Sequence, residues 1–182
     1  MLKTLRQIRR TGIVTEPLPA PDLALRIRAT LERRILGILG RALAVRMVDA
    51  GSCNGCELEV HALSNPIYNI EGLGVHFVAS PRHADLLLVS GPVTVAMRDP
   101  LLRVYEATPD PKLVVAVGDC GRDGGVFGCG GPSLGAVANV IPVDVVVPGC
   151  PPSPNRLLAG ILAALDASAA LDVRQEGRGR AE

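Results

Sequence analysis

Five short runs of almost unbroken apolar residues constrain the fold of this sequence more than any other feature. They are Ala42–Val48, Gly74–Ala79, Asp85–Ser90, Lys112–Gly118 and Asp144–Val147. A strand with one face in water alternates apolar and polar residues, whereas a continuous apolar run is typical of a parallel strand covered by helices on both faces. The sequence therefore predicts an α/β fold with a doubly wound, mostly parallel sheet.

Helical periodicity marks the segments around these runs. Asp22 is placed to cap a helix that extends to about Gly40, with apolar residues at helical spacing: Leu23, Ile27, Leu31, Ile35 and Ile38. Such a helix packs on the core or a partner subunit, or lies on a membrane surface. Further helices are expected over Glu57–Leu63, Pro100–Ala107 and Ser153–Leu165. We expect a basic arm and amphipathic helix in residues 1–41, one domain over residues 42–168, and a frayed polar tail in residues 169–182.

Composition excludes several classes of function. Aromatic residues make up 2% of the 182 residues, too few for the stacking surfaces of nucleic-acid-binding proteins. The net charge of +1 provides no bulk attraction to nucleic acid or anionic lipid. No apolar run is long enough to span a bilayer, so we expect a cytoplasmic chain without a transmembrane segment.

Four of the five cysteines follow apolar runs. Cys53 and Cys56 form a C-x-x-C pair after the first run, Cys120 follows the fourth, and Cys150 follows the fifth. Because the carboxyl ends of parallel strands meet at one edge of a sheet, we expect these four thiols to form one site. Cys129 lies in a glycine-rich loop with no strand leading into it. It is either a small loop residue or a reactive or substitute thiol.

Three chemistries suit cysteines in this arrangement. Zinc and a [4Fe–4S] cluster both accept four thiolates, whereas thioredoxin-type redox chemistry would leave Cys120 and Cys150 without a role. Structural zinc sites usually use two C-x-x-C-like pairs, but here Cys120 and Cys150 stand alone in loops rich in glycine and proline. This spacing favours a cluster and leaves zinc and thiol redox chemistry open.

Charged residues near the cysteines offer further candidates. Glu57 and Glu59 lie at the start of a predicted helix, where carboxylates are favourable, and either could relay protons near the metal. Arg82 is either an ordinary loop charge or a cation that raises the potential of the cluster. We expect His61 and His83 to be surface or packing residues.

Several long motifs occur in an order that resembles one known family. They are GSCNGCELE, SPRHADLLLVSGPVT, GDCGRDGGVF and PVDVVVPGCPPSP, and the similar region, Val48–Leu165, is about two-thirds of the chain. The family is the cluster-bearing small subunit shared by respiratory complex I (the NADH–quinone oxidoreductase B-type, or 20 kDa, subunit) and membrane-bound [NiFe] hydrogenases. Asn54 and Gly55 separate the first two cysteines, as in energy-converting hydrogenases such as formate hydrogenlyase, whereas complex I has adjacent cysteines.

The resemblance implies a flavodoxin-like fold and one [4Fe–4S] cluster on Cys53, Cys56, Cys120 and Cys150. It implies electron transfer between ferredoxin-like subunits and the Ni–Fe site of a large partner subunit, with membrane subunits anchoring the complex at the cytoplasmic face of the cell membrane. The complex I alternative has a 49 kDa-like partner and passes electrons to quinone near Arg82 and Thr94. A zinc-stabilised binding module is an alternative of another class. No complete active site is expected on this chain alone.

Overall fold

Five parallel strands form the centre of the molecule. The computed structural model describes residues 21–179, and its sheet has the strand order β2-β1-β3-β4-β5. The strands are β1 (Leu43–Asp49), β2 (Val75–Phe77), β3 (Leu86–Ser90), β4 (Leu113–Val117) and β5 (Val145–Val147). All four neighbouring pairs are parallel. This is the doubly wound order of flavodoxin-like folds, so the predicted fold class is confirmed.

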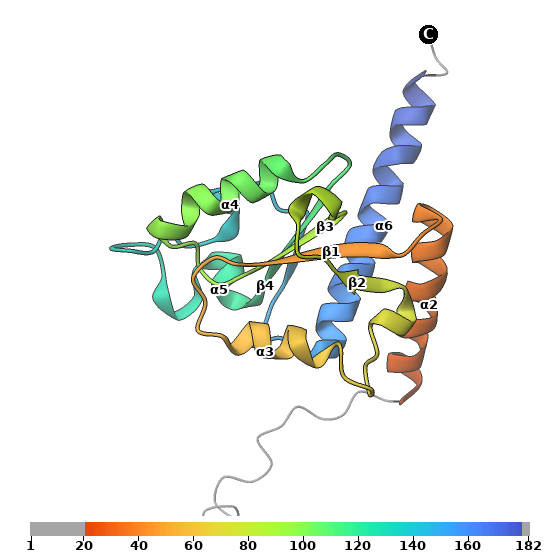
Figure 1. The fold of residues 1–182 in the computed structure, drawn as a ribbon, viewed down its shortest axis with the longest axis horizontal. Coiled ribbons are helices and arrows are strands. Elements are labelled where there is room, and N and C mark those ends of the chain that lie inside the picture. Colours follow the sequence, from red (N-terminus) through yellow and green to blue (C-terminus); the bar gives the residue numbers. More distant parts are fainter. Residues whose placement is uncertain (1–20, 180–182) are drawn as a thin grey trace, which may run out of the picture.

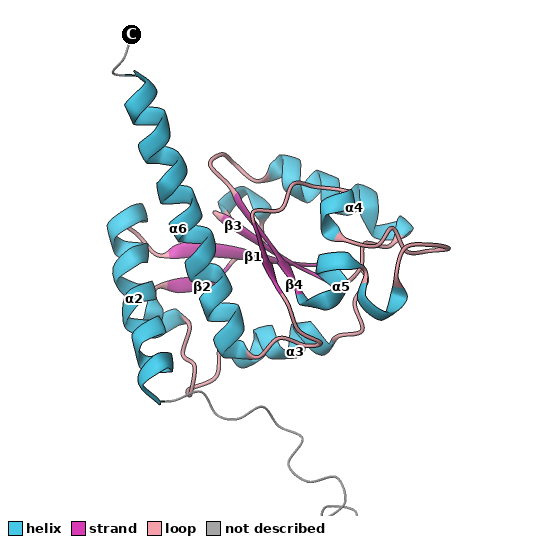
Figure 2. Ribbon diagram, turned by 180° about the vertical axis from the view of Figure 1, so that it is seen from behind, coloured by secondary structure: helices cyan, strands magenta, loops and turns pink. Residues whose placement is uncertain are grey.

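Helices cover both faces of the sheet (Figures 1 and 2). One layer contains α2 (Pro21–Leu39), α3 (Gly55–Ala62) and α6 (Pro154–Gly179), and the other contains α4 (Val95–Ala107) and α5 (Gly118–Asp123). Short 3-10 turns at Glu71–Leu73, Pro81–His83, Gly125–Phe127 and Val137–Asn139 complete the connections.

The apolar runs are continuous because successive side chains enter two different cores. In β3, Leu86 and Leu88 belong to the core beneath α2, α3 and α6, whereas Leu87 and Val89 belong to the core beneath α4. Both sets are at most 1% exposed. Since a strand alternates its side chains between faces, a strand between two cores carries apolar residues at successive positions.

Helix α2 packs on the core. Leu31 and Ile35 are fully buried, Ile27 packs against the same core, and Arg34 forms an ion pair of 3.2 Å with Asp166 of α6. The expectation of an amphipathic helix against the domain is therefore confirmed. The basic arm in residues 1–20, the side chains of Leu23 and Ile38, and the proposed cap at Asp22 lie outside the described residues and side chains.

Three helices differ from the sequence prediction, and one of them, the short helix α5, is not predicted at all. Helix α4 begins at Val95 and contains Pro100, which the sequence analysis takes as its first residue. Helix α6 runs to Gly179, so residues 169–179 are helical where a frayed polar tail is predicted. No proline interrupts this segment, and alanine, leucine, glutamine and arginine favour a helix. Between residues 21 and 179, no helix combines the length and apolar character that crossing a bilayer requires.

Candidate metal centre

The loop that carries Cys53 is held by the residue that ends β1. The Asp49 carboxylate accepts hydrogen bonds of 2.8 Å from the N–H groups of Gly51 and Ser52. This turn leads directly into α3, which begins at Gly55 and contains Cys56 in its first turn. A side-chain acceptor two or three residues before its donors is a common way of stabilising such a turn. The C-x-x-C pair therefore lies at the carboxyl end of β1.

Thr94 also holds this loop in place through hydrogen bonds to Ala50. Its N–H and its hydroxyl donate hydrogen bonds of 2.9 Å and 3.3 Å to the Ala50 carbonyl. A Cβ added at Gly51 would overlap the Thr94 side chain, and Gly51 has a φ of +123° that favours glycine. Thr94, a residue singled out in the sequence, therefore lies beside the C-x-x-C loop.

Strand β4 passes directly into the short helix α5, which carries Cys120. The first residue of this helix, Gly118, has a φ of +81°. A Cβ at Gly118 would lie 2.7 Å from Cys56 Sγ and 3.3 Å from the Gly149 carbonyl oxygen. The glycine thus allows α3 and the loop after β5 to approach the start of α5 closely.

All four strand-end thiols line one cavity. Cys56 and Cys120 are buried, while Cys53 and Cys150 are exposed. The wall also contains Ser52, Gly55, Gly91, Asp119, Gly149 and Pro151. Cys129 is exposed and does not line this cavity. The structure therefore brings together the four thiols that strand position selects.

Burial raises the pKa of the two buried thiols, Cys56 and Cys120. Burial, followed by the nearby charge of Glu57 and then the other three thiols, raises the pKa of Cys56 to about 12. Burial also raises the pKa of Cys120, with Cys150 the next cause. Metal ligation requires the thiolate, so loading this site would release protons.

The donor set fits a [4Fe–4S] cluster. Such a cluster takes four cysteine thiolates, and its potential depends on hydrogen bonding and burial around the sulfurs. Glycines beside the cysteines leave space: a Cβ at Gly55, in the cavity wall, would lie 3.6 Å from Cys53 Sγ, and one at Gly125, outside that wall, would lie 2.9 Å from Cys120 Sγ. Within residues 21–179, the structure has no group of three or more His, Cys, Asp or Glu side chains that could bind a single metal ion.

Glu57 and Glu59, the two proposed proton-relay residues, have different environments. Glu57 is 5% exposed and accepts a hydrogen bond from the Ser90 hydroxyl at the end of β3. Its other carboxyl oxygen is buried and has no partner among the described residues. Glu59 is partly exposed, and neither acid lines the thiol cavity. The proton relay stays a prediction.

The structure does not bring Arg82 to the cysteines. Strand β2 has only three residues, so the chain leaves it close to the amino end of β3. The connection between the two strands therefore stays at that edge of the sheet. Arg82 and His83 lie there, lining a hollow with Arg41 and Asp85. This is the edge opposite the thiols and Thr94, so Arg82 and Thr94 do not share a pocket. His61 is exposed and lines a separate hollow beside α3.

Sequence analysis missed two residues of this region. Ser90, which binds Glu57, is the polar end of an otherwise apolar run. Asp119 immediately precedes Cys120 and accepts a hydrogen bond of 3.1 Å from Gly149 N–H. Both are polar residues at or just after the carboxyl end of a buried strand. This position could have identified them as candidate site residues, because ligands bind at this edge of a parallel sheet.

The fold and the cysteines define a class of protein: a flavodoxin-like α/β domain with a four-thiol cavity at the carboxyl edge of its sheet. The family described as NADH ubiquinone oxidoreductase, 20 Kd subunit, matches residues 53–164, a range that contains all four thiols. The chain belongs to this family, and the resemblance stated from its motifs is confirmed.

Similar proteins include subunits of hydrogenases and of complex I. Formate hydrogenlyase subunit 7 of Escherichia coli K12 is 42% identical over 148 residues, which are 81% of this chain and 58% of that protein. The probable membrane-bound hydrogenase subunit mbhJ of Pyrococcus furiosus is 47% identical over 142 residues, 76% of this chain and 85% of the relative. The B-type subunit of NADH-quinone oxidoreductase from Pelodictyon phaeoclathratiforme is 40% identical over 114 residues, 59% and 57% of the two chains.

A solved structure is also similar. A chain of the membrane-bound sulfane sulfur reductase, described as an archaeal respiratory membrane complex, superposes with a TM-score of 0.61 and 30% identity. The match covers 79% of this chain and 74% of the other. The present chain is thus a hydrogenase- and complex I-type subunit whose relatives are subunits of oxidoreductase complexes. It spans less than two thirds of the formate hydrogenlyase and NADH-quinone oxidoreductase relatives.

Proposed function

We propose that this chain is an electron-transfer subunit with one [4Fe–4S] cluster in a membrane-associated [NiFe] hydrogenase complex. The observation that carries the proposal is the meeting of Cys53, Cys56, Cys120 and Cys150 from three strand ends in one cavity. These four residues hold the cluster, which accepts and releases one electron at a time. Asp49 and Thr94 hold the C-x-x-C loop in place.

The partners follow from the same proposal. A large hydrogenase subunit holds the Ni–Fe site, a ferredoxin-like subunit exchanges electrons with this chain, and membrane subunits anchor the complex at the cytoplasmic face of the membrane. The C-x-x-C spacing supports this assignment, as do the longer matches to the two hydrogenase-type relatives, 81% and 76% of this chain against 59% for the NADH-quinone oxidoreductase relative.

A complex I-type role is the second candidate. The family match and the 40% identity to an NADH-quinone oxidoreductase relative favour it. In this role the cluster would pass electrons to quinone beside a 49 kDa-like partner. The separation of Arg82 from Thr94 gives no support to a quinone pocket that contains both residues.

Element analysis of the complex, isolated anaerobically through this chain, tests these functions. Iron and sulfide together with nickel are the expected result. Iron and sulfide without nickel would favour the quinone-reducing complex. Zinc without sulfide, from a preparation kept free of oxygen, would replace electron transfer with a zinc-stabilised binding module.

Single Cys→Ser substitutions test which thiols hold the cluster. We expect Cys53→Ser, Cys56→Ser, Cys120→Ser or Cys150→Ser to remove most of the iron that the reconstituted chain binds and to lower electron transfer in the complex by at least about tenfold, because a hydroxyl is a poor substitute for a thiolate ligand. Cys129→Ser is the matched control and should retain iron and activity. Loss of iron from the Cys129 variant would contradict the assignment of the four ligands.

A further inference from the structure

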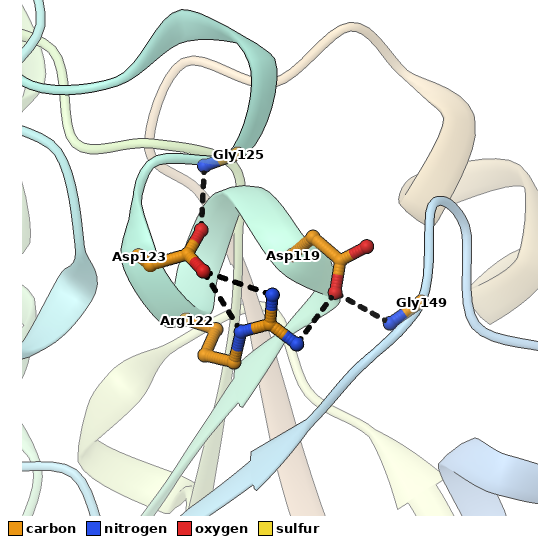
Figure 3. A network of polar contacts seen from close by, with 5 residues as sticks. All are labelled: Asp119, Arg122, Asp123, Gly125 and Gly149. Carbon is orange, nitrogen blue, oxygen red and sulfur yellow. Dashed lines mark hydrogen bonds and ion pairs between the residues drawn. The ribbon is translucent and has the colours of Figure 1, made fainter.

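Two of the cysteine-bearing segments are joined by a reciprocal pair of hydrogen bonds. The Asp119 N–H donates to the Gly149 carbonyl over 2.8 Å. In return, the Gly149 N–H donates to Asp119 Oδ1 over 3.1 Å, the bond drawn in Figure 3. Asp119 directly precedes Cys120, and Gly149 directly precedes Cys150. One residue thus uses both its backbone and its side chain to connect two of the thiol-bearing segments.

The segment with Cys150 depends on such a connection. It follows β5, a three-residue strand at the edge of the sheet that pairs with β4 alone. Gly149 has a φ of +141°, and a Cβ there would lie 2.7 Å from Pro152 Cα. The backbone is therefore tightly turned around Gly149, and its N–H points to Asp119 rather than to another strand.

Arg122 holds the Asp119 carboxylate from the outer side. Its Nη1 lies 3.1 Å from Asp119 Oδ1, and its Nη2 lies 2.8 Å from Asp123 Oδ2. Asp123 Oδ1 in turn accepts a hydrogen bond of 2.8 Å from the Gly125 N–H (Figure 3). The contacts of Asp119, Arg122 and Asp123 therefore connect the Cys150 segment to the loop at Gly125, which lies beside Cys120.

We propose that Asp119 is a positioning residue that locks the Cys150 segment to helix α5 and thereby fixes the spacing of Cys120 and Cys150 around the cluster. The inference rests on the proposed function for the cluster. The two hydrogen bonds between Asp119 and Gly149, which we call the lock, form within the polypeptide itself. Its carboxylate also places a negative charge beside Cys120, where it lowers the potential of a bound cluster.

Two substitutions separate these effects. Asp119→Ala removes the acceptor and the charge, whereas Asp119→Asn keeps an Oδ1 acceptor for Gly149 and removes the charge. Asp99→Asn is the matched control, because Asp99 is likewise paired with a neighbouring arginine, Arg98, but takes no part in the thiol cavity. All three variants would be compared within the isolated complex.

Hydrogen exchange measures the lock without reference to the metal. Residues 148, 151 and 152 are prolines, so a peptide over residues 148–153 reports on the amides of Gly149, Cys150 and Ser153. We expect exchange in this peptide to be about tenfold faster in Asp119→Ala, the effect of losing one hydrogen bond, and near wild type in Asp119→Asn. Unchanged protection in Asp119→Ala would overturn the proposal.

Redox titration and electron paramagnetic resonance then test the link to the cluster. Asp119→Asn should retain iron and raise the midpoint potential, because a negative charge is removed. Asp119→Ala should lose iron or change the spectrum. The positioning role would be overturned if exchange in the 148–153 peptide were faster in Asp119→Ala while the spectrum and the midpoint potential of both variants stayed as in the wild type. Wild-type complex without iron would refute the proposed function instead, while the exchange result would still decide whether Asp119 forms the lock.

Discussion

Gly118 shows how closely single residues are constrained around the thiols. Its φ of +81° is unfavourable for any residue with a side chain, and an added Cβ would meet Cys56 Sγ at 2.7 Å. We expect Gly118→Ala to destabilise the full-length chain by about 1–3 kcal/mol, measured by urea unfolding, and to lower the iron content of the complex.

Gly37 provides the control for that substitution. It lies inside α2 with nothing within 4 Å of an added Cβ. Gly37→Ala should therefore stabilise the chain by about 0.5–1 kcal/mol, because alanine loses less backbone entropy in a helix. Equal and unchanged stability in both variants would show that the close contact at Gly118 is relaxed in solution.

The four cysteines were predictable because each follows a strand, and the strands themselves were visible as apolar runs. Arg82 was not predictable in the same way. Its distance from the thiols depends on β2 ending after three residues, which the longer apolar segment Gly74–Ala79 did not indicate. Asp119 and Ser90 were missed because their partners, Gly149 and Glu57, lie 30 and 33 residues away in the sequence.

At the scale of elements, α2 has a sharp division between its two sides. Ile35 is fully buried against the core that also contains α6, while its neighbour Leu36 is 61% exposed. We expect Ile35→Ala to lower the free energy of unfolding by about 2–5 kcal/mol through loss of burial and creation of a cavity. Leu36→Ala should change it by less than about 0.5 kcal/mol.

The measurement is denaturant unfolding of the full-length chain, with iron content determined in parallel. Ile35 does not line the thiol cavity, so Ile35→Ala in the folded complex should still bind iron. If the two variants were equally stable, α2 would not be part of the cooperative unit formed by the domain.

Element boundaries were least predictable where a local signal has two meanings. Proline favours the first turn of a helix, so Pro100 predicts a helix start, but α4 already begins at Val95. Thr94, the residue before the helix, has an extended backbone, and its N–H donates a hydrogen bond to the Ala50 carbonyl. That contact joins residues 44 positions apart, and no local pattern of α4 encodes it.

At the scale of the whole molecule, two separate cores support one edge. One core lies beneath α2, α3 and α6 and includes Cys56, while the other lies beneath α4. Cys120 is buried at the junction of β4 and α5. The thiol cavity is therefore built where the strands end and where α3 and α5 begin, and its geometry depends on the complete fold rather than on one loop.

The reactivity of the five thiols follows from this arrangement. In the reconstituted full-length chain with its cluster bound, the four ligands are protected, and Cys129, exposed outside the cavity, should be the thiol that an alkylating reagent labels. After anaerobic removal of the iron by a chelator, Cys53 and Cys150 should react before the buried Cys56 and Cys120. Mass spectrometry of the labelled peptides gives the order. Labelling of Cys53 with iron still fully bound, or protection of Cys129 that ends when the iron is removed, would require a different ligand set.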